Sequence, residues 1–223
     1  MALYIVATPI GNIKDITLRA LETLKEVDLI LCEDTRHSGQ LLHNYKIKKP
    51  LLSFHEYNEL TRIPEIIQRL KNGENIALIS DAGTPLISDP GFKLVRAARE
   101  EGIDVKTIPG PASAIAAMSI SGLPTDKFLF VGYQPKTSGK REKLLETLVE
   151  IKNKLPTSII FYESPHRVDK LLEELSKVFP ESQVSVQREL TKIHETVLTG
   201  SINEVRKQLT GKSHKGEFTI VLN

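Results

Sequence analysis

The stretch NIALISDAGTPLISDPG, residues 75–91, indicates most clearly which fold this chain adopts. It begins with an expected strand, residues 75–80, whose apolar middle, IALI, has the length of a short buried strand. The run passes into a turn rich in glycine and proline, and residues 92–101 then have the pattern of a helix that ends at Gly102. A buried strand followed by a turn and a helix is the repeating unit of an α/β sheet.

The same alternation of strands and helices extends from this stretch to the start of the chain and onward to residue 121. The expected strands are residues 3–7, 28–32, 51–54 and 104–108. The expected helices are one capped by Asp15 and three more over residues 35–45, 63–72 and 112–121. Turn residues then cluster in Gly122-Leu-Pro-Thr-Asp126, which predicts a domain boundary at that point.

Beyond this boundary the alternation resumes. The expected strands are residues 128–133, 158–162, 183–187, 195–199 and 216–222, and the expected helices are residues 140–152, 166–179 and 202–209. The sequence therefore predicts two α/β domains, an N-terminal domain of residues 1–122 and a C-terminal domain of residues 123–223.

The composition excludes several classes of protein. Of the 223 residues, 40% are hydrophobic and 26% are charged, which is ordinary for a globular protein and excludes a disordered or fibrous chain. The single cysteine, Cys32, excludes an intrachain disulfide and a cysteine-rich metal site. Because the formal net charge is only +2, any surface for nucleic acid must consist of local groups of basic residues.

The sequence also predicts where the protein acts. Its first residues, MALYIVATP, lack the basic start and the long apolar stretch of a signal peptide. No window approaches the roughly 18 apolar residues that a membrane helix requires. A lone cysteine suits a reducing compartment. We therefore expect a cytoplasmic protein with no membrane segment.

The common nucleotide and catalytic signatures are absent from the sequence, which contains no Gly-x-Gly, no His-Glu-x-x-His and no Gly-x-Ser-x-Gly. What remains is a set of glycine- and proline-rich turns at residues 8–12, 81–91 and 109–111, each at the carboxyl end of an expected strand. Ligands of open α/β sheets bind at this edge, and glycine lets the backbone approach a ligand closely. The turns therefore predict a ligand site.

Seven motifs occur in order along the chain and extend from Leu3 to Leu222. They are TPIGN (8–12), EDTR (33–36), SFHE (53–56), ISDAGTPLISDPG (79–91), PGPAS (109–113), FYESPHR (161–167) and RELTK (188–192). Together they resemble the tetrapyrrole methylase superfamily, and within it the branch that methylates small-subunit ribosomal RNA. A small-molecule tetrapyrrole methylase carries an aspartate after the glycine of the fourth motif, where this chain has Thr84.

The resemblance implies a fold and an activity. The fold is two α/β domains with a cofactor cleft between them, in a homodimer. The cofactor is S-adenosyl-L-methionine, and the reaction is 2′-O-methylation of a cytidine ribose in the decoding region of 16S rRNA, within the small ribosomal subunit. No metal is implied, because the donor carries its own leaving group.

The resemblance also implies which residues bind the cofactor. In the first half of the chain these are Pro9, Ile10, Asp81, Ala82, Gly83, Thr84, Ile87 and Ala112. Further along the chain they are Ser113, Tyr162, Leu190, Gly216 and Glu217. Asp81 has a second interpretation, in which its carboxylate only shapes the turn by accepting backbone hydrogen bonds.

Polar residues at the ends of expected strands are candidates for the chemistry, because a ribose hydroxyl needs a nearby proton acceptor. We expect Asp34, Glu163 and His55 as catalytic residues, although Asp34 and Glu163 could equally cap helices and His55 could be a surface loop residue. Arg36, Arg167 and Lys192 are expected to bind RNA phosphates, and an ion pair is the alternative role for Lys192.

Two other functions remain open from the sequence. One is methylation of a small tetrapyrrole on the same scaffold, and the other is a ribosome-assembly factor that binds the donor only as a sensor. For the RNA methyltransferase, we expect the assembled small subunit to be a better substrate than a short RNA, because a protein reaches an exposed nucleotide more easily than one inside a closed helix.

Overall fold

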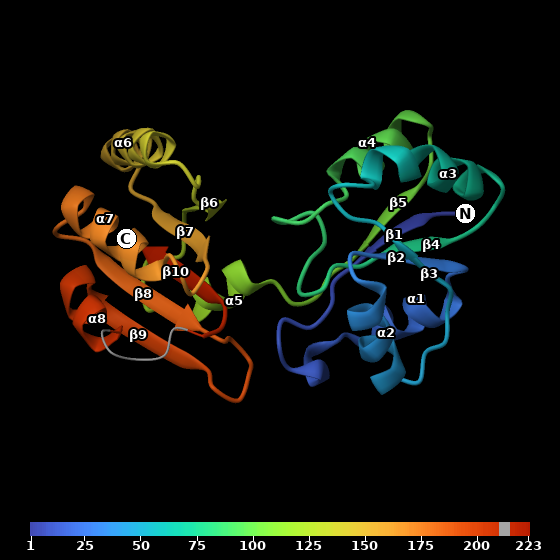
Figure 1. Ribbon diagram of the computed structural model, residues 1–223, viewed down its shortest axis with the longest axis horizontal. Coiled ribbons are helices and arrows are strands. Elements are labelled where there is room, and N and C mark those ends of the chain that lie inside the picture. Colours follow the sequence, from blue (N-terminus) through green and yellow to red (C-terminus); the bar gives the residue numbers. More distant parts are fainter. Residues whose placement is uncertain (210–214) are drawn as a thin grey trace. The chain divides into compact units, whose positions relative to one another are not determined.

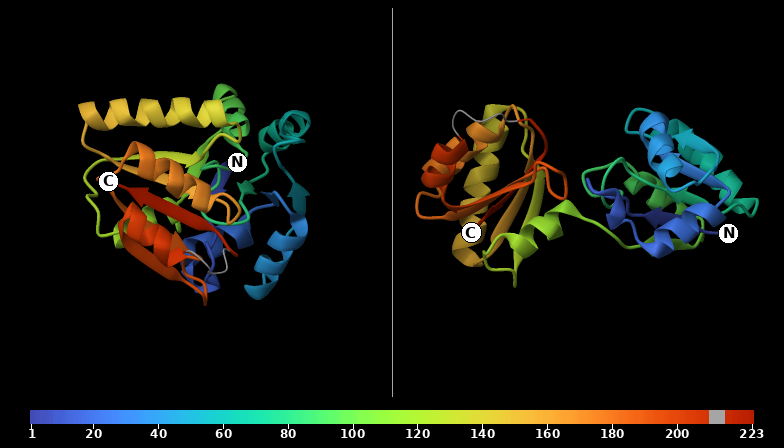
Figure 2. Two further views of the ribbon diagram at one scale, coloured as in Figure 1. Left: turned by 60° about the vertical axis from the view of Figure 1, so that its left-hand side comes forward. Right: turned by 90° about the horizontal axis from the view of Figure 1, so that it is seen from below.

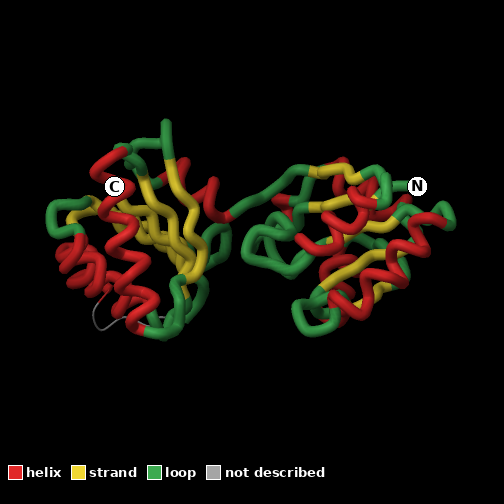
Figure 3. The backbone as a smooth tube through the Cα atoms, turned by 90° about the horizontal axis from the view of Figure 1, so that it is seen from above, coloured by secondary structure: helices red, strands yellow, loops and turns green. Residues whose placement is uncertain are grey.

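The computed structural model describes residues 1–209 and 215–223 and contains two compact units, Met1–Ala112 and Ser113–Asn223 (Figure 1). In each unit helices pack on the faces of a five-stranded sheet, and loops connect the two kinds of element (Figure 3). None of the helices in the described residues is long and apolar enough to cross a membrane.

The first unit is built on a parallel sheet with strand order β3-β2-β4-β1-β5. Its elements are β1 (Leu3–Val6), the 3₁₀ helix η1 (Ile13–Asp15), α1 (Leu18–Glu26), β2 (Leu29–Cys32), α2 (Thr35–Asn44), β3 (Leu51–Ser53), α3 (Glu59–Lys71), β4 (Ile76–Leu78), α4 (Phe92–Glu100) and β5 (Val105–Ile108). Because all five strands run in the same direction, their carboxyl ends meet at one edge of the sheet.

Both faces of this sheet are covered by helices, which explains why its strands are short continuous apolar runs. Leu29 and Leu31 of β2 join one buried cluster with residues of α3 and α4, whereas Ile30 and Cys32 join a second cluster with residues of α1 and α2. Figure 1 shows α3 and α4 on one side of the sheet and α1 and α2 on the other. Alternate side chains of one strand therefore serve two cores.

The second unit is built on a mixed sheet with strand order β6-β7-β10-β8-β9, in which only β6 and β7 are parallel. Its elements are α5 (Ser113–Ile120), β6 (Phe128–Tyr133), α6 (Ser138–Lys154), β7 (Ser158–Glu163), α7 (Val168–Val178), β8 (Gln183–Arg188), β9 (Thr196–Ser201), α8 (Ile202–Leu209) and β10 (Phe218–Leu222).

The core of the second unit lies between the sheet and α6, α7 and α8 (Figure 2). Helix α5 packs against β7 and β10. It therefore belongs to the second compact unit, and the division between the units falls earlier in the chain than the predicted boundary at Gly122.

Most expected elements are present, and two helix starts differ from expectation. Asp15 does not cap α1, because it lies inside η1; Thr17 caps the helix instead and accepts a hydrogen bond from the Ala20 amide. Helix α3 begins at Glu59, before the expected start at Ile63, and continues through Pro64. Proline removes one backbone donor and so interrupts the helical signal in the sequence, although the helix itself continues.

Candidate functional site

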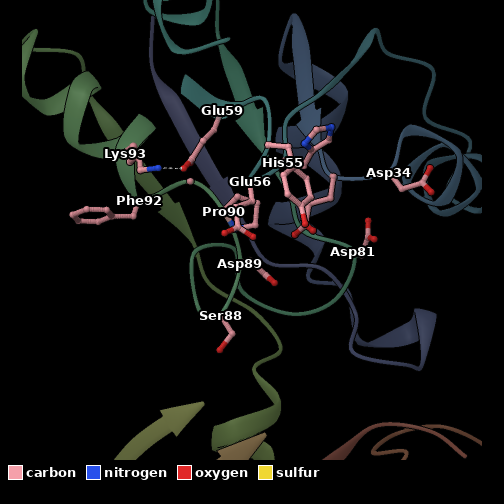
Figure 4. A pocket seen from close by; sticks show the side chains of 13 residues that line it. Asp34, His55, Glu56, Glu59, Asp81, Ser88, Asp89, Pro90, Phe92 and Lys93 are labelled. Atoms are coloured by element: carbon pink, nitrogen blue, oxygen red, sulfur yellow. Dashed lines mark ion pairs between the residues drawn. The ribbon is translucent and has the colours of Figure 1, made fainter. Parts of the chain in front are cut away.

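A pocket of about 680 Å³ lies in the first unit, just beyond the carboxyl ends of β2, β3 and β4 (Figure 4). Its volume is in the range of small-ligand sites. The lining residues are Glu33, Asp34, His55, Glu56, Tyr57, Glu59, Asp81, Ser88, Asp89, Pro90, Gly91, Phe92 and Lys93. The structure thus brings three predicted site residues, Asp34, His55 and Asp81, to one place.

The Asp34 carboxylate caps the N-terminus of α2. Its Oδ1 accepts a 2.8 Å hydrogen bond from the Arg36 amide at the start of α2, and its Oδ2 lies 3.0 Å from the Arg36 guanidinium. These hydrogen bonds from Arg36 lower the pKa of Asp34 to about 2. A carboxylate with so low a pKa is a weak proton acceptor, so the geometry favours capping for Asp34. Arg36 is almost fully exposed and can reach a phosphate.

The neighbouring Glu33 is a carboxyl of a different kind. Burial, together with the charges of Asp89 and Asp81, raises the pKa of Glu33 to about 7. Burial likewise raises the pKa of Asp89 to about 6. The sequence analysis named Asp34 as a catalytic candidate with helix capping as its alternative role, and it did not select Glu33, because the sequence does not show which of two consecutive carboxyl groups becomes buried. It also missed Asp89, Tyr57 and Phe92 as residues of the pocket.

His55 is held in place by Asn58. The Asn58 amide oxygen accepts a 2.8 Å hydrogen bond from the His55 backbone, and its nitrogen donates to Ser53 O at 3.1 Å and lies 3.2 Å from His55 Nε2. This orientation of the amide assigns the lone pair of the neutral imidazole to Nε2 and the proton to Nδ1. Nδ1 is buried and has no hydrogen-bond partner among the described residues, and the same holds for Asp81 Oδ1.

The pocket is strongly acidic. Six of its lining residues are Asp or Glu and one is Lys. That lysine, Lys93, forms a 2.6 Å ion pair with the buried Glu59, seen in Figure 4 on the side away from Asp34 and Asp81. Nevertheless, no three His, Cys, Asp or Glu side chains within residues 1–209 and 215–223 converge as a metal site would require.

The raised pKa of Glu33 has a consequence for stability. Between pH 4.5 and about 7 the folded chain holds a proton at Glu33 that the unfolded chain releases, so the free energy of unfolding falls as pH rises through this range. We therefore expect Glu33→Gln to melt a few degrees higher than the unmodified protein at pH 8 and to lose this advantage at pH 5. Thermal melts at both values test this, with exposed Glu65→Gln as the control. An advantage that is larger at pH 5 contradicts it.

The residues of the first unit that are predicted to bind S-adenosylmethionine, the methyl donor, also lie close together. Thr8 and Gly83 form an isolated bridge, with Thr8 N donating to Gly83 O at 2.9 Å and Gly83 N to Thr8 O at 3.2 Å. Thr84 Oγ1 donates to Pro111 O at 3.1 Å. Gly83 has a φ of +81°, and a Cβ there would lie 3.3 Å from the Ile10 side chain. The three turns at residues 8–12, 81–91 and 109–111 therefore form one surface of closely approached backbone.

In the second unit, the residues that are predicted to bind S-adenosylmethionine form two groups. Ser113 Oγ donates to the Tyr162 hydroxyl at 2.6 Å, and the Ala114 amide, at the start of α5, donates to the same oxygen at 3.2 Å. In the other group, Glu189 Oε1 accepts from the Glu217 amide at 3.1 Å. A Cβ on Gly216 would lie only 2.5 Å from this glutamate side chain.

The remaining predicted residues are held in ion pairs. Lys192 Nζ lies 2.9 Å from Glu189 Oε1 and 2.7 Å from Glu217 Oε2. Arg167 Nη2 lies 2.7 Å from Glu163 Oε1, which also accepts from the Ser164 amide. The Glu163 side chain is 1% exposed, so its environment favours a role in holding Arg167 over direct contact with an acceptor.

The fold and the site can now be compared with known proteins. The family model for Tetrapyrrole (Corrin/Porphyrin) Methylases matches residues 2–206. Among solved structures, uroporphyrin-III-C-methyltransferase from Thermus thermophilus covers 99% of this chain and 93% of its own, with a TM-score of 0.66 and 21% identity. The match to diphthine synthase covers 100% of this chain and 90% of that protein's chain, with a TM-score of 0.72 and 15% identity. The architecture is thus that of the tetrapyrrole methylases.

Curated relatives show which branch of the tetrapyrrole methylases this chain resembles most in sequence. The ribosomal RNA small subunit methyltransferase I of Thermotoga maritima is 46% identical over 99% of this chain and 97% of its own length. Those of Haemophilus influenzae and Escherichia coli O157:H7 are 49% and 46% identical, over 99% of this chain and 77% of theirs. The chain belongs to the ribosomal RNA small subunit methyltransferase I family, which confirms the resemblance seen in the sequence.

Proposed function

We propose that this protein transfers a methyl group from S-adenosylmethionine to the 2′ hydroxyl of a cytidine ribose in the decoding region of 16S rRNA. One observation carries the proposal beyond family membership. The segment of residues 81–91 contributes Gly83 and Thr84 to the donor surface and Asp81, Ser88 and Asp89 to the pocket. A single loop of the first unit therefore connects a surface suited to the donor with a pocket suited to an acceptor.

The residues present fit the proposed donor. The bridge between Thr8 and Gly83 holds two turns so close that the backbone itself can face a ligand. Ile87 is exposed beside them and offers apolar surface to an adenine ring. A solved neighbour, the Thermus thermophilus uroporphyrin-III C-methyltransferase, was obtained with S-adenosylhomocysteine bound; it has a TM-score of 0.67 and is 16% identical to this chain.

The proposed reaction depends mainly on position. When bound, S-adenosylmethionine would supply a methyl group that is bonded to a positively charged sulfur. This sulfur is the leaving group. With the donor bound, the ribose oxygen would bond to the methyl carbon while the carbon–sulfur bonding pair leaves with S-adenosylhomocysteine, and the hydroxyl proton would pass to solvent. Holding the reacting atoms in line is worth a large part of the barrier. The rigid turns of the first unit and the pocket beside them are the features of this chain that can do so.

We assign positioning roles to the three residues predicted as catalytic. Asp34 caps α2 and orients Arg36, His55 shapes the pocket wall, and Glu163 holds Arg167. Arg36, Arg167 and Lys192 are the proposed RNA contacts. Asp34→Asn, His55→Gln and Glu163→Gln are therefore expected to raise KM for the subunit and to leave the pH profile of kcat unchanged. A shifted profile in any one of them identifies that residue as the proton acceptor.

The proposal is tested by mapping the methyl group. Purified protein is incubated with labelled S-adenosylmethionine and small subunits from cells that lack the modification, and the RNA is digested and analysed by mass spectrometry. Label on one cytidine ribose is the expected result. No label, while calorimetry shows intact donor binding, contradicts the proposal and favours a small-molecule acceptor or a donor sensor.

Three further points belong to this proposal. The protein acts in the cytoplasm, as a homodimer, and on the assembled small subunit in preference to short RNA. Equal turnover of a minimal hairpin and of the subunit contradicts the last point.

A further inference from the structure

We infer that the outward face of α2 and the turn that follows it bind the phosphate backbone of the RNA that carries the acceptor nucleotide. This inference rests on the proposed function, because it extends the proposed RNA contact at Arg36 along one helix. The residues of this surface are exposed and are either basic or able to donate hydrogen bonds. We call it the α2 surface, and it consists of Arg36, His37, Gln40, His43, Lys46 and Lys48.

The segment that contains the α2 surface, residues 35–55, has no acidic residue. Asp and Glu make up 28 of the 223 residues, or about one in eight, so a stretch of this length would ordinarily contain some. The segment instead carries one arginine, three lysines and three histidines. A local group of basic residues attracts phosphates, although the net charge of the whole chain is only +2.

The two lysines of the turn are available to an anion. Lys46 and Lys48 are exposed, and their side chains form no ion pair or hydrogen bond with the residues that the structure describes. Ile47 between them is buried in the core that α1 and α2 share, which directs both lysines outward. On the opposite face of the sheet, by contrast, each lysine and arginine of α3 has a carboxylate partner at 2.6 to 3.0 Å. The α2 surface therefore carries positive charge that the fold itself does not use.

One acidic residue from another element comes near this turn. The Tyr45 hydroxyl donates a hydrogen bond to Ile13 O, which holds η1 beside the end of α2. Burial, and after it the charge of Asp15 in η1, raises the pKa of Tyr45. Asp15 forms no ion pair with Lys46 or Lys48, so both lysines keep their charge for a ligand.

Lys46 has a backbone conformation that favours glycine. Its φ is +58°, in the left-handed region. Its amide donates to His43 O at 2.9 Å, and the Ile47 amide donates to Leu42 O at 2.9 Å. These two hydrogen bonds close the helix in the Schellman motif, in which the residue with positive φ is usually glycine.

Two other helices of the first unit end in the same motif and have glycine at this position. The residue is Gly73 after α3 and Gly102 after α4, each with a positive φ and the same pair of hydrogen bonds. A positive charge near the end of a helix is favourable, but the gain is smaller than the cost of a side chain in the left-handed region. The fold alone would therefore favour glycine after α2, and the lysine there indicates that its charge serves a ligand.

The composition of the α2 surface favours RNA over a protein as this ligand. No large apolar side chain is exposed between residues 35 and 50. The centre of a protein interface is apolar and poor in lysine, so the α2 surface lacks the features that a protein partner requires. Phosphates, in contrast, need only basic and hydrogen-bonding groups.

The position of the α2 surface also suits RNA. Helix α2 begins directly after Asp34, which lines the pocket, and its ten residues span about 15 Å. RNA with its acceptor nucleotide at the pocket would therefore place neighbouring phosphates along α2. There they lie away from the carboxyl groups of the pocket, which repel them.

Substitution by glycine provides a sharp test, because Lys46→Gly removes the charge and at the same time relieves the backbone strain. We would measure binding of the protein to small subunits from cells that lack the modification, and separately to protein-free 16S rRNA, over a series of salt concentrations. The variants are Lys46→Gly, Lys46→Arg and Lys48→Gln, with Arg99→Gln as the control for the loss of one positive charge. Arg99 is exposed in the last turn of α4, on the opposite face of the sheet, and its side chain has no ion pair among the described residues.

We expect Lys46→Gly and Lys48→Gln each to bind both the subunit and the free rRNA about fivefold more weakly than the unmodified protein does. Each should also reduce the steepness of log affinity against log salt by about 1, because one phosphate contact is lost. Lys46→Arg and Arg99→Gln should keep both the affinity and the salt dependence. Lys46→Gly should in addition melt at the same temperature as the unmodified protein or higher, because glycine removes the strain.

Unchanged affinity and salt dependence in either Lys46→Gly or Lys48→Gln overturn the inference. An equal loss in Arg99→Gln overturns it too, because total charge and not its place would then decide binding. A loss with the intact subunit but not with protein-free rRNA identifies a ribosomal protein as the partner and also overturns it. A lower melting temperature of Lys46→Gly shows that the lysine serves the fold, which overturns the inference as well.

The inference and the proposed function fail in different ways. If methyl mapping finds the labelled cytidine ribose while Lys46→Gly binds RNA as the unmodified protein does, only the assignment of the α2 surface is wrong. If binding depends on Lys46 and Lys48 as described but no ribose is methylated, the RNA surface stands and the proposed reaction is wrong.

Discussion

Replacing Gly91 by alanine is expected to lower the free energy of unfolding of the first unit by about 3 kcal/mol. Gly91 has a φ of +127°, which side chains rarely adopt, and it stands directly before α4. An added Cβ would lie 2.6 Å from Leu78 Cδ2 and 3.1 Å from Leu86 Cδ1. Backbone strain and overpacking of a buried strand residue therefore act together at one position.

Gly102, at the other end of α4, offers the matched control. It also has a positive φ, of +69°, but a Cβ there would have no neighbour within 4 Å. Gly102→Ala should therefore cost only the backbone strain, about 1 kcal/mol. Urea denaturation of both variants measures the difference. Because Gly91 lines the pocket, Gly91→Ala should also lower methyl transfer, and equal stability of the two variants contradicts the steric argument.

Replacing Arg141 by methionine is expected to lower the free energy of unfolding of the second unit by about 3 kcal/mol. The Arg141 side chain, on α6, is 8% exposed and makes hydrogen bonds of 3.0 and 3.1 Å to the Glu174 carboxylate on α7, which is 20% exposed. Its Nη1 also donates to Lys136 O at 2.7 Å. Without Arg141, a largely buried carboxylate and a backbone carbonyl both lose their partner.

Two further variants separate this effect from general damage to α6. Lys143→Met changes an exposed residue of the same helix and should alter stability by less than about 0.5 kcal/mol. The double variant Arg141→Met with Glu174→Leu removes both charges and should recover much of the loss. Urea midpoints measure all three, and a double variant less stable than Arg141→Met alone contradicts the buried-pair explanation.

The same ion pair bears on function. Arg141 binds the carbonyl of Lys136, and Arg167 Nη1 donates to the carbonyl of Gln134 at 3.3 Å in the same connection between β6 and α6. Loosening this connection should move Arg167, a proposed RNA contact. We therefore expect Arg141→Met to weaken binding of the small subunit as well as stability.

Much of the fold could be predicted from the sequence, because local patterns encode it. Runs such as residues 29–32 are apolar without alternation, as required for a strand covered on both faces, and glycine or proline marks where strands and helices end. What local patterns could not supply was the compact unit to which α5 belongs. Its small apolar residues suit packing against any sheet, and only contacts with β7 and β10 place it in the second unit.

For the candidate site, too, some features follow from the sequence and others only from the tertiary structure. The sequence by itself determined the motifs, the family and the turns at the carboxyl ends of the strands, because each is a property of consecutive residues. Only the tertiary structure decided that Asp34 caps a helix while Glu33 lines the pocket beside Asp81 and Asp89. Burial and the approach of charges from distant segments set the pKa of a carboxyl group, and neither exists until the chain is folded.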